Sequence, residues 1–181
     1  MRMRRANAAE FTGIRKFYWD LIDQMQGRQD TVGWKKGIYP ADSFLQESLD
    51  RGELYVIDGA DGPLACVILN SLWNEGYEGL PWRCRCAREE VLVPHALAVA
   101  PAEQGKGLGR QLVRELIELA EAAGKKAVRL DILSGNLAAE RLYTGMGFQY
   151  VATKALFYED TGLTAFRMYE LALSAAGGAQ P

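Results

Sequence analysis

The chain has 181 residues, of which 49% are hydrophobic and 24% charged, and its formal net charge is -2. This composition is typical of one globular domain with a sizeable core, and it argues against a disordered or fibrous chain. The small net charge argues against a nucleic-acid-binding surface, which carries a marked excess of lysine and arginine, and favours small molecules or peptides as partners.

No apolar run reaches the length of a membrane span and none follows the basic residues 1–5, so we expect a cytoplasmic protein. The three cysteines are odd in number and suggest no disulfide framework, so we expect reduced thiols. Cys84 and Cys86 with His95, the only histidine, are conceivable metal ligands, but their spacing matches no zinc pattern and a fourth ligand is missing. Alternation along a strand explains the two cysteines better, and we expect no metal.

Two helices are predicted in the first third of the chain. Asn7 and Glu10 have the spacing of a capping box, and apolar side chains recur at helical spacing through residues 8–26. A shorter helix follows Asp42, a candidate N-cap, and stops at Gly52.

Two long irregular segments, residues 27–39 and 71–90, carry aromatic side chains. Segments of this length are more often functional than idle, so we expect them to form walls of a substrate site. Aromatic residues that anchor a loop to the core are, however, at least as common as those that bind a ligand. The aromatic residues expected in an acceptor pocket are Trp34, Tyr39, Trp73 and Trp82.

Short segments rich in apolar and β-branched residues predict the strands, which are residues 54–58, 64–70, 91–100, 127–133, 149–156 and 165–173. The first two form a hairpin. Pro94 implies that the third strand lies at a sheet edge or carries a bulge, since proline cannot donate to a sheet ladder. The order strand, helix, strand across residues 91–133 implies a right-handed crossover between parallel strands.

A turn rich in glycine, residues 104–109, joins the strand at residues 91–100 to a long amphipathic helix that stops at Gly124. Glycines allow backbone N–H groups to approach a ligand closely, and the start of a helix adds unpaired donors and a partial positive charge. This joint therefore predicts an anion site that fits a pyrophosphate. A shorter helix begins at Asn136 and stops at Gly147.

Two motifs carry a resemblance to a known family. The first is Gln104-x-x-Gly107-x-Gly109, and the second is Asn136 followed by Tyr143 and by Gly147-Phe148. With the order of predicted elements, they make the chain resemble the GCN5-related N-acetyltransferases (GNAT), which move an acetyl group from acetyl-coenzyme A (acetyl-CoA) to an amine. The resemblance covers about residues 3–173. Other glycine motifs fit less well, because a P-loop needs Ser or Thr after Gly-Lys and a dinucleotide fingerprint needs glycine at the position of Arg110.

The resemblance implies an α/β fold with a mostly antiparallel sheet, one parallel pair at the cofactor groove and about four flanking helices. It implies a single domain over residues 1–173, with a disordered tail at 174–181. Many relatives pair through their C-terminal strands, which keeps a homodimer open.

The resemblance also places acetyl-CoA. Backbone N–H groups of the glycine turn would hold the pyrophosphate, and the Val99 N–H would donate to the thioester oxygen. Lys106 and Arg110 either reach phosphate or are simply solvated. The implied cofactor residues are Leu97, Ala98, Val99, Gln104, Gly105, Lys106, Gly107, Leu108, Gly109, Arg110, Asn136 and Tyr143.

By the same resemblance, Tyr143 would donate a proton or a hydrogen bond to the departing thiolate. Asp131 is the preferred general base, with Glu90 and His95 as alternatives. The implied activity is direct transfer of acetyl to a primary amine of a small molecule or peptide, and the acceptor is expected among residues 27–39, residues 71–90 and the turn near Asp160. The alternative is a non-catalytic domain that binds acyl-CoA as a sensor.

Overall fold

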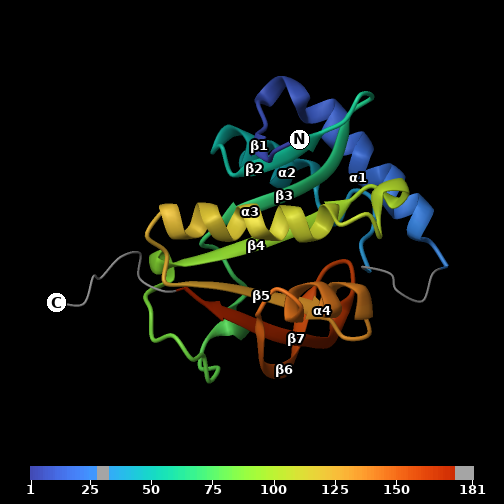
Figure 1. Ribbon diagram of the computed structural model, residues 1–181. Coiled ribbons are helices and arrows are strands. Elements are labelled where there is room, and N and C mark those ends of the chain that lie inside the picture. The colour runs from blue at the N-terminus through green and yellow to red at the C-terminus, as the bar shows by residue number, and fades with distance from the viewer. Residues whose placement is uncertain (28–32, 174–181) are drawn as a thin grey trace.

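The computed structural model describes residues 1–27 and 33–173, and its centre is a mixed sheet (Figure 1). The strand order is β1-β2-β3-β4-β5-β7-β6. The strands are β1 (Arg4–Arg5), β2 (Leu54–Asp58), β3 (Pro63–Asn70), β4 (Val91–Val99), β5 (Ala127–Leu133), β6 (Gln149–Tyr158) and β7 (Gly162–Ala172). All neighbours run antiparallel except β4 and β5, which are parallel. The predicted mixed sheet with one parallel pair is confirmed.

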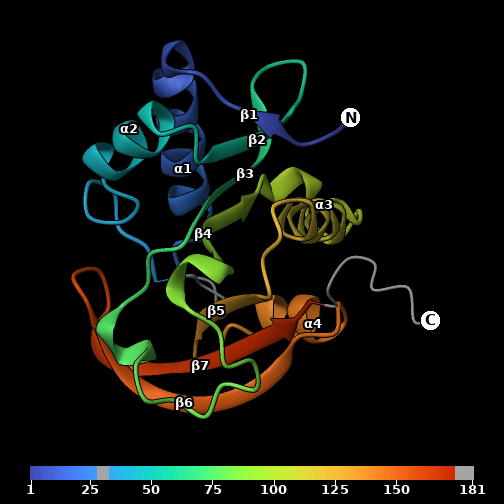
Figure 2. The ribbon, with the colours of Figure 1, turned by 90° about the vertical axis from the view of Figure 1, so that its left-hand side faces the viewer.

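Helices cover both faces of this sheet, with α1 and α2 on one side and α3 and α4 on the other (Figure 2). Their bounds are α1 (Phe11–Met25), α2 (Asp42–Asp50), α3 (Leu108–Ala122) and α4 (Leu137–Thr144). Short 3-10 turns are η1 (Ala8–Glu10), η2 (Glu75–Tyr77), η3 (Arg88–Glu90) and η4 (Pro101–Glu103). No helix among the described residues is long and apolar enough to cross a membrane.

Local signals in the sequence locate most of these boundaries. The capping box is present, since the Asn7 side chain accepts from the Ala9 N–H and Glu10 accepts from the Asn7 N–H. The predicted N-cap at Asp42 is wrong by one position, because Ala41 is the cap and Asp42 is the first helical residue. The two-residue strand β1 was not expected, since so short a segment carries no periodic pattern. The expected disordered tail lies outside the described residues.

The apolar faces of the helices create one core on each side of the sheet. On one side, Leu112 and Leu116 of α3 are fully buried in a cluster with Val67 of β3 and Leu130 of β5. On the other side, Tyr18 and Leu21 of α1 pack with the side chains of β2 and β3 that face them. The sheet is thus a rigid support, and its strand ends can present functional groups.

The parallel pair β4 and β5 separates almost as soon as it forms. The two strands are in register only at Val91 with Ala127 and Leu92 with Val128. Beyond that point β4 bulges against β3, so that Ala96 and Leu97 lie opposite a single residue of β3.

The bulge has an unusual backbone and a specific support. Ala96 has a positive φ of 49°, a conformation that costs a non-glycine residue about 1–2 kcal/mol. The fully buried Tyr18 of α1 donates its hydroxyl hydrogen to the Ala96 carbonyl at 2.8 Å. Of the two alternatives for Pro94, a bulge at that residue is wrong, because Pro94 pairs regularly with Leu69 and the bulge lies at Ala96 and Leu97. β4 lies between β3 and β5, but at Pro94 no described residue pairs with it on the β5 side, so the proline occupies a locally unpaired edge.

A buried ion pair attaches the irregular segment 71–90 to the sheet. Arg129 of β5 donates from Nε to Glu170 Oε1 of β7 at 3.0 Å, and both side chains are almost completely buried. The second oxygen of Glu170 accepts from the N–H groups of Arg83 and Cys84 at 2.7 and 3.2 Å. A buried pair is stable only when its remaining hydrogen-bonding positions are used, and here the backbone of the segment uses them.

Candidate functional site

The glycine turn is open to solvent and has the backbone that an anion site needs. Gly105 and Gly107 have φ values of +78° and +88°, and a Cβ added to either would meet no atom within 4 Å. Gly107 is the N-cap of α3, and its carbonyl accepts the first intrahelical bond from the Gln111 N–H. The N–H groups of the first turn of α3 therefore have no acceptor within the helix and can bind a ligand.

Side-chain contacts connect this turn to the end of β4. Gln104 donates its amide N–H to the Val99 carbonyl at 3.1 Å. The Ala100 N–H donates to the Leu64 carbonyl of β3. Since successive residues of a strand direct their backbone groups to opposite sides, Val99 directs its own N–H and C=O away from β3. Val99 lies beyond the residues where β4 pairs with β5, so its N–H faces the gap between the two strands.

A groove of about 330 Å³ runs along the turn and the end of β4. Most of the expected cofactor residues line it, namely Leu97, Ala98, Val99, Gln104, Gly105, Gly107, Gly109, Arg110 and Asn136. Lys106 is not among them and forms an ion pair with Glu103 at 3.1 Å, whereas Leu108 packs against the core. Arg110 is therefore the cation of the expected set that faces the groove.

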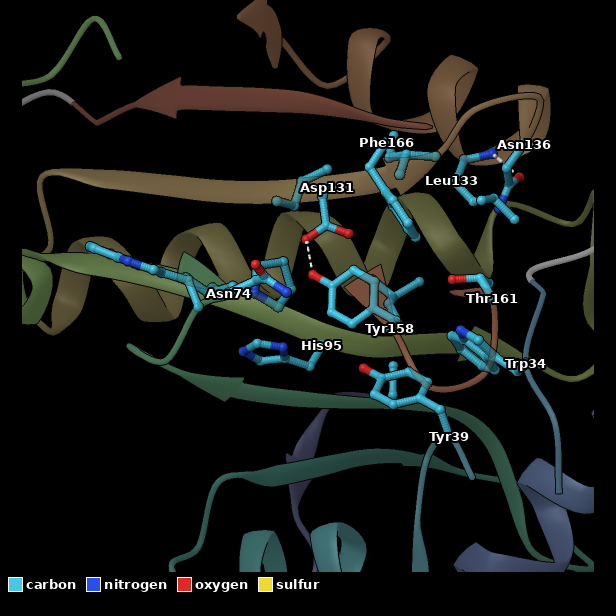
Figure 3. A pocket seen from close by; sticks show the side chains of 18 of the residues that line it. Trp34, Tyr39, Asn74, His95, Asp131, Leu133, Asn136, Tyr158, Thr161 and Phe166 are labelled. Carbon is cyan, nitrogen blue, oxygen red and sulfur yellow. Dashed lines mark hydrogen bonds between the residues drawn. The ribbon is translucent and has the colours of Figure 1, made fainter. Parts of the chain in front are cut away.

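A second cavity, of about 320 Å³, lies in the gap between β4 and β5 (Figure 3). It adjoins the groove, since both are lined by Trp34, Leu97, Asn136 and Ala139. The aromatic residues that line it are Trp34, Tyr39, Phe44, Trp73, Tyr77, Tyr143, Tyr158 and Phe166. A molecule in the groove can thus place its end against a molecule in the cavity.

Asp131 of β5 lies on one side of the cavity, with His95 and Tyr39 on the other (Figure 3). Its Oδ2 accepts hydrogen bonds from the hydroxyls of Tyr77 at 2.8 Å and Tyr158 at 3.0 Å. Its Oδ1 has no hydrogen-bond partner among the described residues. Burial raises the pKa of Asp131, and the two phenol hydrogen bonds oppose that rise only in part. A carboxylate with a raised pKa is a stronger base than an exposed aspartate.

The two residues of the downstream motif lie on or just before α4. The Asn136 side-chain oxygen caps the helix by accepting from the Ala139 N–H at 3.1 Å. Tyr143 is buried at the cavity wall, and its ring packs edge-on against Phe148. Burial raises the pKa of Tyr143, and the charge of Asp131 adds to the effect, so the phenol keeps its proton at neutral pH.

His95 faces the same cavity as a neutral ring. Its Nε2 lies 2.9 Å from Asn70 Oδ1, and that oxygen also accepts from the Leu72 N–H. Because Asn70 Oδ1 can only accept, the Nε2 atom of His95 carries the hydrogen. Burial lowers the pKa of His95 to about 4, which makes it a weak base.

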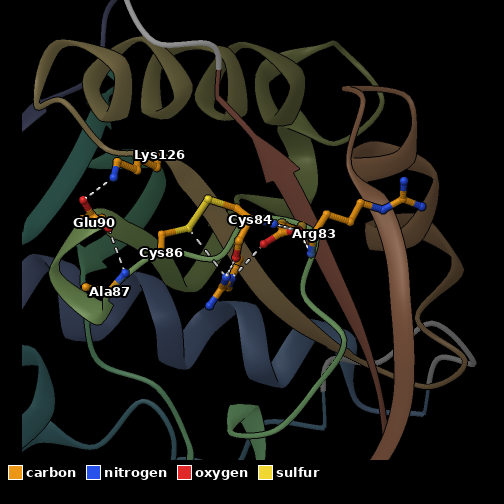
Figure 4. Close-up of a disulfide and its surroundings, with 8 residues drawn as sticks. Arg83, Cys84, Cys86, Ala87, Glu90 and Lys126 are labelled. Atoms are coloured by element: carbon orange, nitrogen blue, oxygen red, sulfur yellow. Dashed lines mark hydrogen bonds and ion pairs between the residues drawn. A yellow bond between two sulfur atoms is a disulfide. The ribbon is translucent and has the colours of Figure 1, made fainter.

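The third candidate base, Glu90, lies outside the cavity. It precedes β4, at the end of the strand where β4 and β5 are still paired, and it forms an ion pair with Lys126 at 2.6 Å. It also accepts from the Ala87 N–H, and these bonds lower its pKa (Figure 4). We therefore do not retain Glu90 as a base.

The cysteine expectations are corrected at this end of the molecule. Cys84 and Cys86 are joined by a disulfide with a Cα–Cα separation of 5.6 Å, so the expected reduced thiols are wrong for these two (Figure 4). They lie in an irregular segment, so the predicted alternation of the two cysteines along a strand is also wrong. Cys66 is a free, buried thiol.

Trp82 also lies outside the acceptor cavity. It stacks over the Arg129 guanidinium at 4.5 Å and donates its indole N–H to the Tyr77 carbonyl. Trp82 therefore contacts Tyr77 without lining the cavity itself. Trp34, Tyr39 and Trp73 line the cavity as expected.

Several lining residues were missed by sequence reasoning. Tyr77 follows Trp73 at a spacing of four within a segment already marked as a wall, which was a usable signal. Tyr158 ends a strand and reaches Asp131 across 27 positions, for which the sequence carries no signal. Asp160 is buried in the turn between β6 and β7 and adds a second carboxylate to the cavity.

Comparisons with known proteins point in one direction. A sequence model described as the acetyltransferase (GNAT) family matches residues 15–148. The N-alpha-acetyltransferase RimI of Mycobacterium tuberculosis is 38% identical over 93 residues, which cover 51% of this chain and 56% of that protein. The L-methionine sulfoximine/L-methionine sulfone acetyltransferase of Salmonella typhimurium is 45% identical over 60 residues, covering 33% of this chain and 35% of that protein. The match thus spans about half or less of these curated relatives.

A solved structure shares the fold. The protein yncA of Salmonella typhimurium, solved with its cofactor acetyl-CoA, superposes with a TM-score of 0.68 at 21% identity. The alignment covers 100% of this chain and 97% of that one.

The raised pKa of Asp131 predicts how stability depends on pH. The Asp131 carboxyl group binds its proton more tightly in the folded state than in the unfolded chain, where the pKa of an aspartate is about 3.9. Above that pH, the ionised and buried carboxylate therefore reduces the free energy of unfolding. We expect Asp131→Asn to be more stable than the native protein at pH 7, and the difference to vanish as the pH falls toward about 3.9.

Urea unfolding at pH 7 and at pH 4 measures this difference. Asp61→Asn is the matched control, because Asp61 is exposed in the turn between β2 and β3 and should show no such dependence. A less stable Asp131→Asn protein at pH 7 would contradict the electrostatic account.

Proposed function

The chain belongs to the acetyltransferase (GNAT) family, and on that premise we propose that it transfers an acetyl group from acetyl-CoA to a primary amine. The observation that carries the proposal is that the glycine-turn groove and the cavity that contains Asp131 adjoin and share lining residues. A thioester in the groove would meet an amine in the cavity near Leu97, Asn136 and Ala139.

The groove residues fit the two polar parts of acetyl-CoA. The open backbone at Gly105 and Gly107 and the unpaired N–H groups of α3 suit a pyrophosphate, since a side chain at either glycine would fill that space. The Val99 N–H, directed into the gap, suits the thioester oxygen and would stabilise the negative charge that develops on it. Arg110 adds a positive charge beside the groove.

In the reaction, the amine nitrogen attacks the thioester carbonyl, a C–N bond forms, and the C–S bond breaks. Amines enter as ammonium ions at neutral pH and must lose a proton first. Asp131 Oδ1 is suited to accept that proton, because Tyr77 and Tyr158 hold the other oxygen and burial strengthens the base. The described cysteines line neither the groove nor the cavity, which favours direct transfer over a cysteine-bound intermediate.

Tyr143 suits the leaving sulfur as a hydrogen-bond donor. A thiol has an ordinary pKa of about 8.5, below that of any phenol. Because the pKa of Tyr143 is raised further, complete proton transfer to the thiolate is unfavourable, whereas donation of a hydrogen bond is not. Tyr143 therefore stabilises the developing charge. Asp131 takes the first proton of the ammonium ion, and the second proton, which the nitrogen releases after the C–N bond has formed, goes to the thiolate and yields the free thiol of CoA.

An assay of thiol release on a panel of primary amines tests the proposed transfer. We expect release that depends on the amine, and we expect Tyr143→Phe to lower kcat by about 100-fold with little change in acetyl-CoA affinity. The alternative is a sensor domain that only binds acyl-CoA. Tight binding of acetyl-CoA without release on any amine would favour that alternative and contradict the transfer.

A substitution at the turn tests the pyrophosphate position. Gly107→Glu should abolish acetyl-CoA binding in calorimetry, because the carboxylate would occupy and repel the phosphate position. Gly124→Glu is the matched control, since Gly124 lies at the other end of α3 with a positive φ of +68° and equally open surroundings. Binding retained by Gly107→Glu would refute the assignment, whereas binding lost in both variants would show that backbone strain alone explains the effect.

A further inference from the structure

The acceptor cavity is negatively charged. Among the described residues that line it, the charged side chains are Asp131 and Asp160, and none is lysine or arginine. His95 adds no positive charge, since burial lowers its pKa to about 4. Burial raises the pKa of Asp160, and the backbone N–H groups of residues 160 and 161 and the exposed Lys35, which is not a lining residue, oppose that rise only in part.

The two carboxylates act on the same space. Asp131 comes from β5, and Asp160 comes from the turn between β6 and β7, where it is 5% exposed. Both charges contribute to raising the pKa of Tyr39 and of Tyr158, after the larger contribution of burial. A group between these two phenols therefore experiences both negative charges, which attract an ammonium ion and repel a carboxylate.

Aromatic rings make up a large part of the remaining lining, beside aliphatic side chains. On one side Tyr39 and Phe44 lie nearly parallel, with ring centroids 6.0 Å apart. Elsewhere along the lining, Trp73 and Tyr77 are stacked at 5.9 Å with an interplanar angle of 7°. Such faces suit an apolar or aromatic body and also attract cations through their electron-rich rings.

The size of the cavity limits the acceptor further. Its volume of about 320 Å³ is at the lower end of small-molecule pockets. That space accommodates an amine on a short arm with one or two rings, whereas the further residues of a peptide would have to lie outside it and gain no contact with its lining.

We propose that the acceptor is a small arylalkyl amine with no carboxylate on the carbon that bears the nitrogen. This inference rests on the proposed acetyl transfer, of which it names the substrate class. An α-amino acid would bring its carboxylate beside Asp131, and no lysine or arginine among the described lining residues could pair with it, so its desolvation and repulsion remain uncompensated there. The cavity thus selects against free amino acids by charge rather than by shape.

Three probes of nearly equal size separate charge from shape. Phenethylamine has no substituent beside the nitrogen, phenylalaninol has a neutral hydroxymethyl group, and phenylalanine has a carboxylate. We expect phenethylamine and phenylalaninol to agree in kcat/KM within about tenfold and phenylalanine to be on the order of 100-fold lower. Phenylalanine acetylated as well as phenethylamine would overturn the inference while leaving the acetyl transfer intact.

A binding measurement separates this inference from the proposed function. Calorimetry of the three probes on protein saturated with CoA should give the same order of affinity whether or not transfer occurs. The predicted order without thiol release would contradict the transfer and support the charge selection. Equal affinities would overturn the charge selection.

Asp160→Asn tests the source of the selectivity. The amide keeps an acceptor for the backbone N–H groups of residues 160 and 161 but removes one of the two charges. We expect the ratio of kcat/KM for phenethylamine to kcat/KM for phenylalanine to fall by about tenfold. The control Asp61→Asn should leave this ratio unchanged. An unchanged ratio in Asp160→Asn would overturn the role of that carboxylate.

A peptide tests the size limit. A tetrapeptide that begins with phenylalanine and ends in an amide has the same ring and no nearby carboxylate. We expect its kcat/KM to fall at least tenfold below that of phenethylamine, because the cavity must exclude its following residues. A tetrapeptide that exceeds every small amine would overturn the small-molecule assignment.

Discussion

The site depends on the early separation of β4 and β5. Two parallel strands in the centre of a sheet normally stay paired, yet these remain in register over only two residue pairs. Beyond the last paired residue, β4 carries the bulge at Ala96, and the hydroxyl of Tyr18 in α1 donates a hydrogen bond to the carbonyl of that strained residue. The backbone strain is therefore offset by a buried hydrogen bond, and the result is a gap in an otherwise continuous core.

The gap between β4 and β5 gives the two sides of the site different polar groups. On the β4 side it frees the backbone of Val99 and leads to the open glycine turn, so that half offers N–H donors. On the β5 side it leaves Asp131 facing a space with no neighbouring strand, where burial strengthens the carboxylate as a base. Phenols from distant parts of the chain, Tyr77 and Tyr158, then fix one of its oxygens. The groove thus offers N–H donors, and the adjoining cavity offers a carboxylate.

Local patterns in the sequence were sufficient for most of the fold. The strands at residues 54–58 and 127–133 have the predicted bounds, and the cap at Asn136 and the stop at Gly124 agree with the signals that marked them. These features depend on short-range hydrogen bonds and on backbone conformations that only certain residues adopt. The site was harder to predict, because its members meet through the tertiary fold. Glu90 and Asp131 both flank the parallel pair, but a sequence cannot tell which end of the pair opens. The Arg129–Glu170 ion pair joins residues 41 positions apart, and no periodic pattern marks it.

The central claim is that Asp131, which faces the space between the separated strands, accepts the proton of the acceptor amine. Steady-state acetylation by Asp131→Asn as a function of pH tests it most directly, with acetyl-CoA affinity measured in parallel. The account predicts a loss in kcat/KM of about 100-fold to 1000-fold at pH 7, unchanged acetyl-CoA affinity and partial recovery at high pH, where the amine loses its proton unaided. Activity within about threefold of the native protein across the pH range would contradict it.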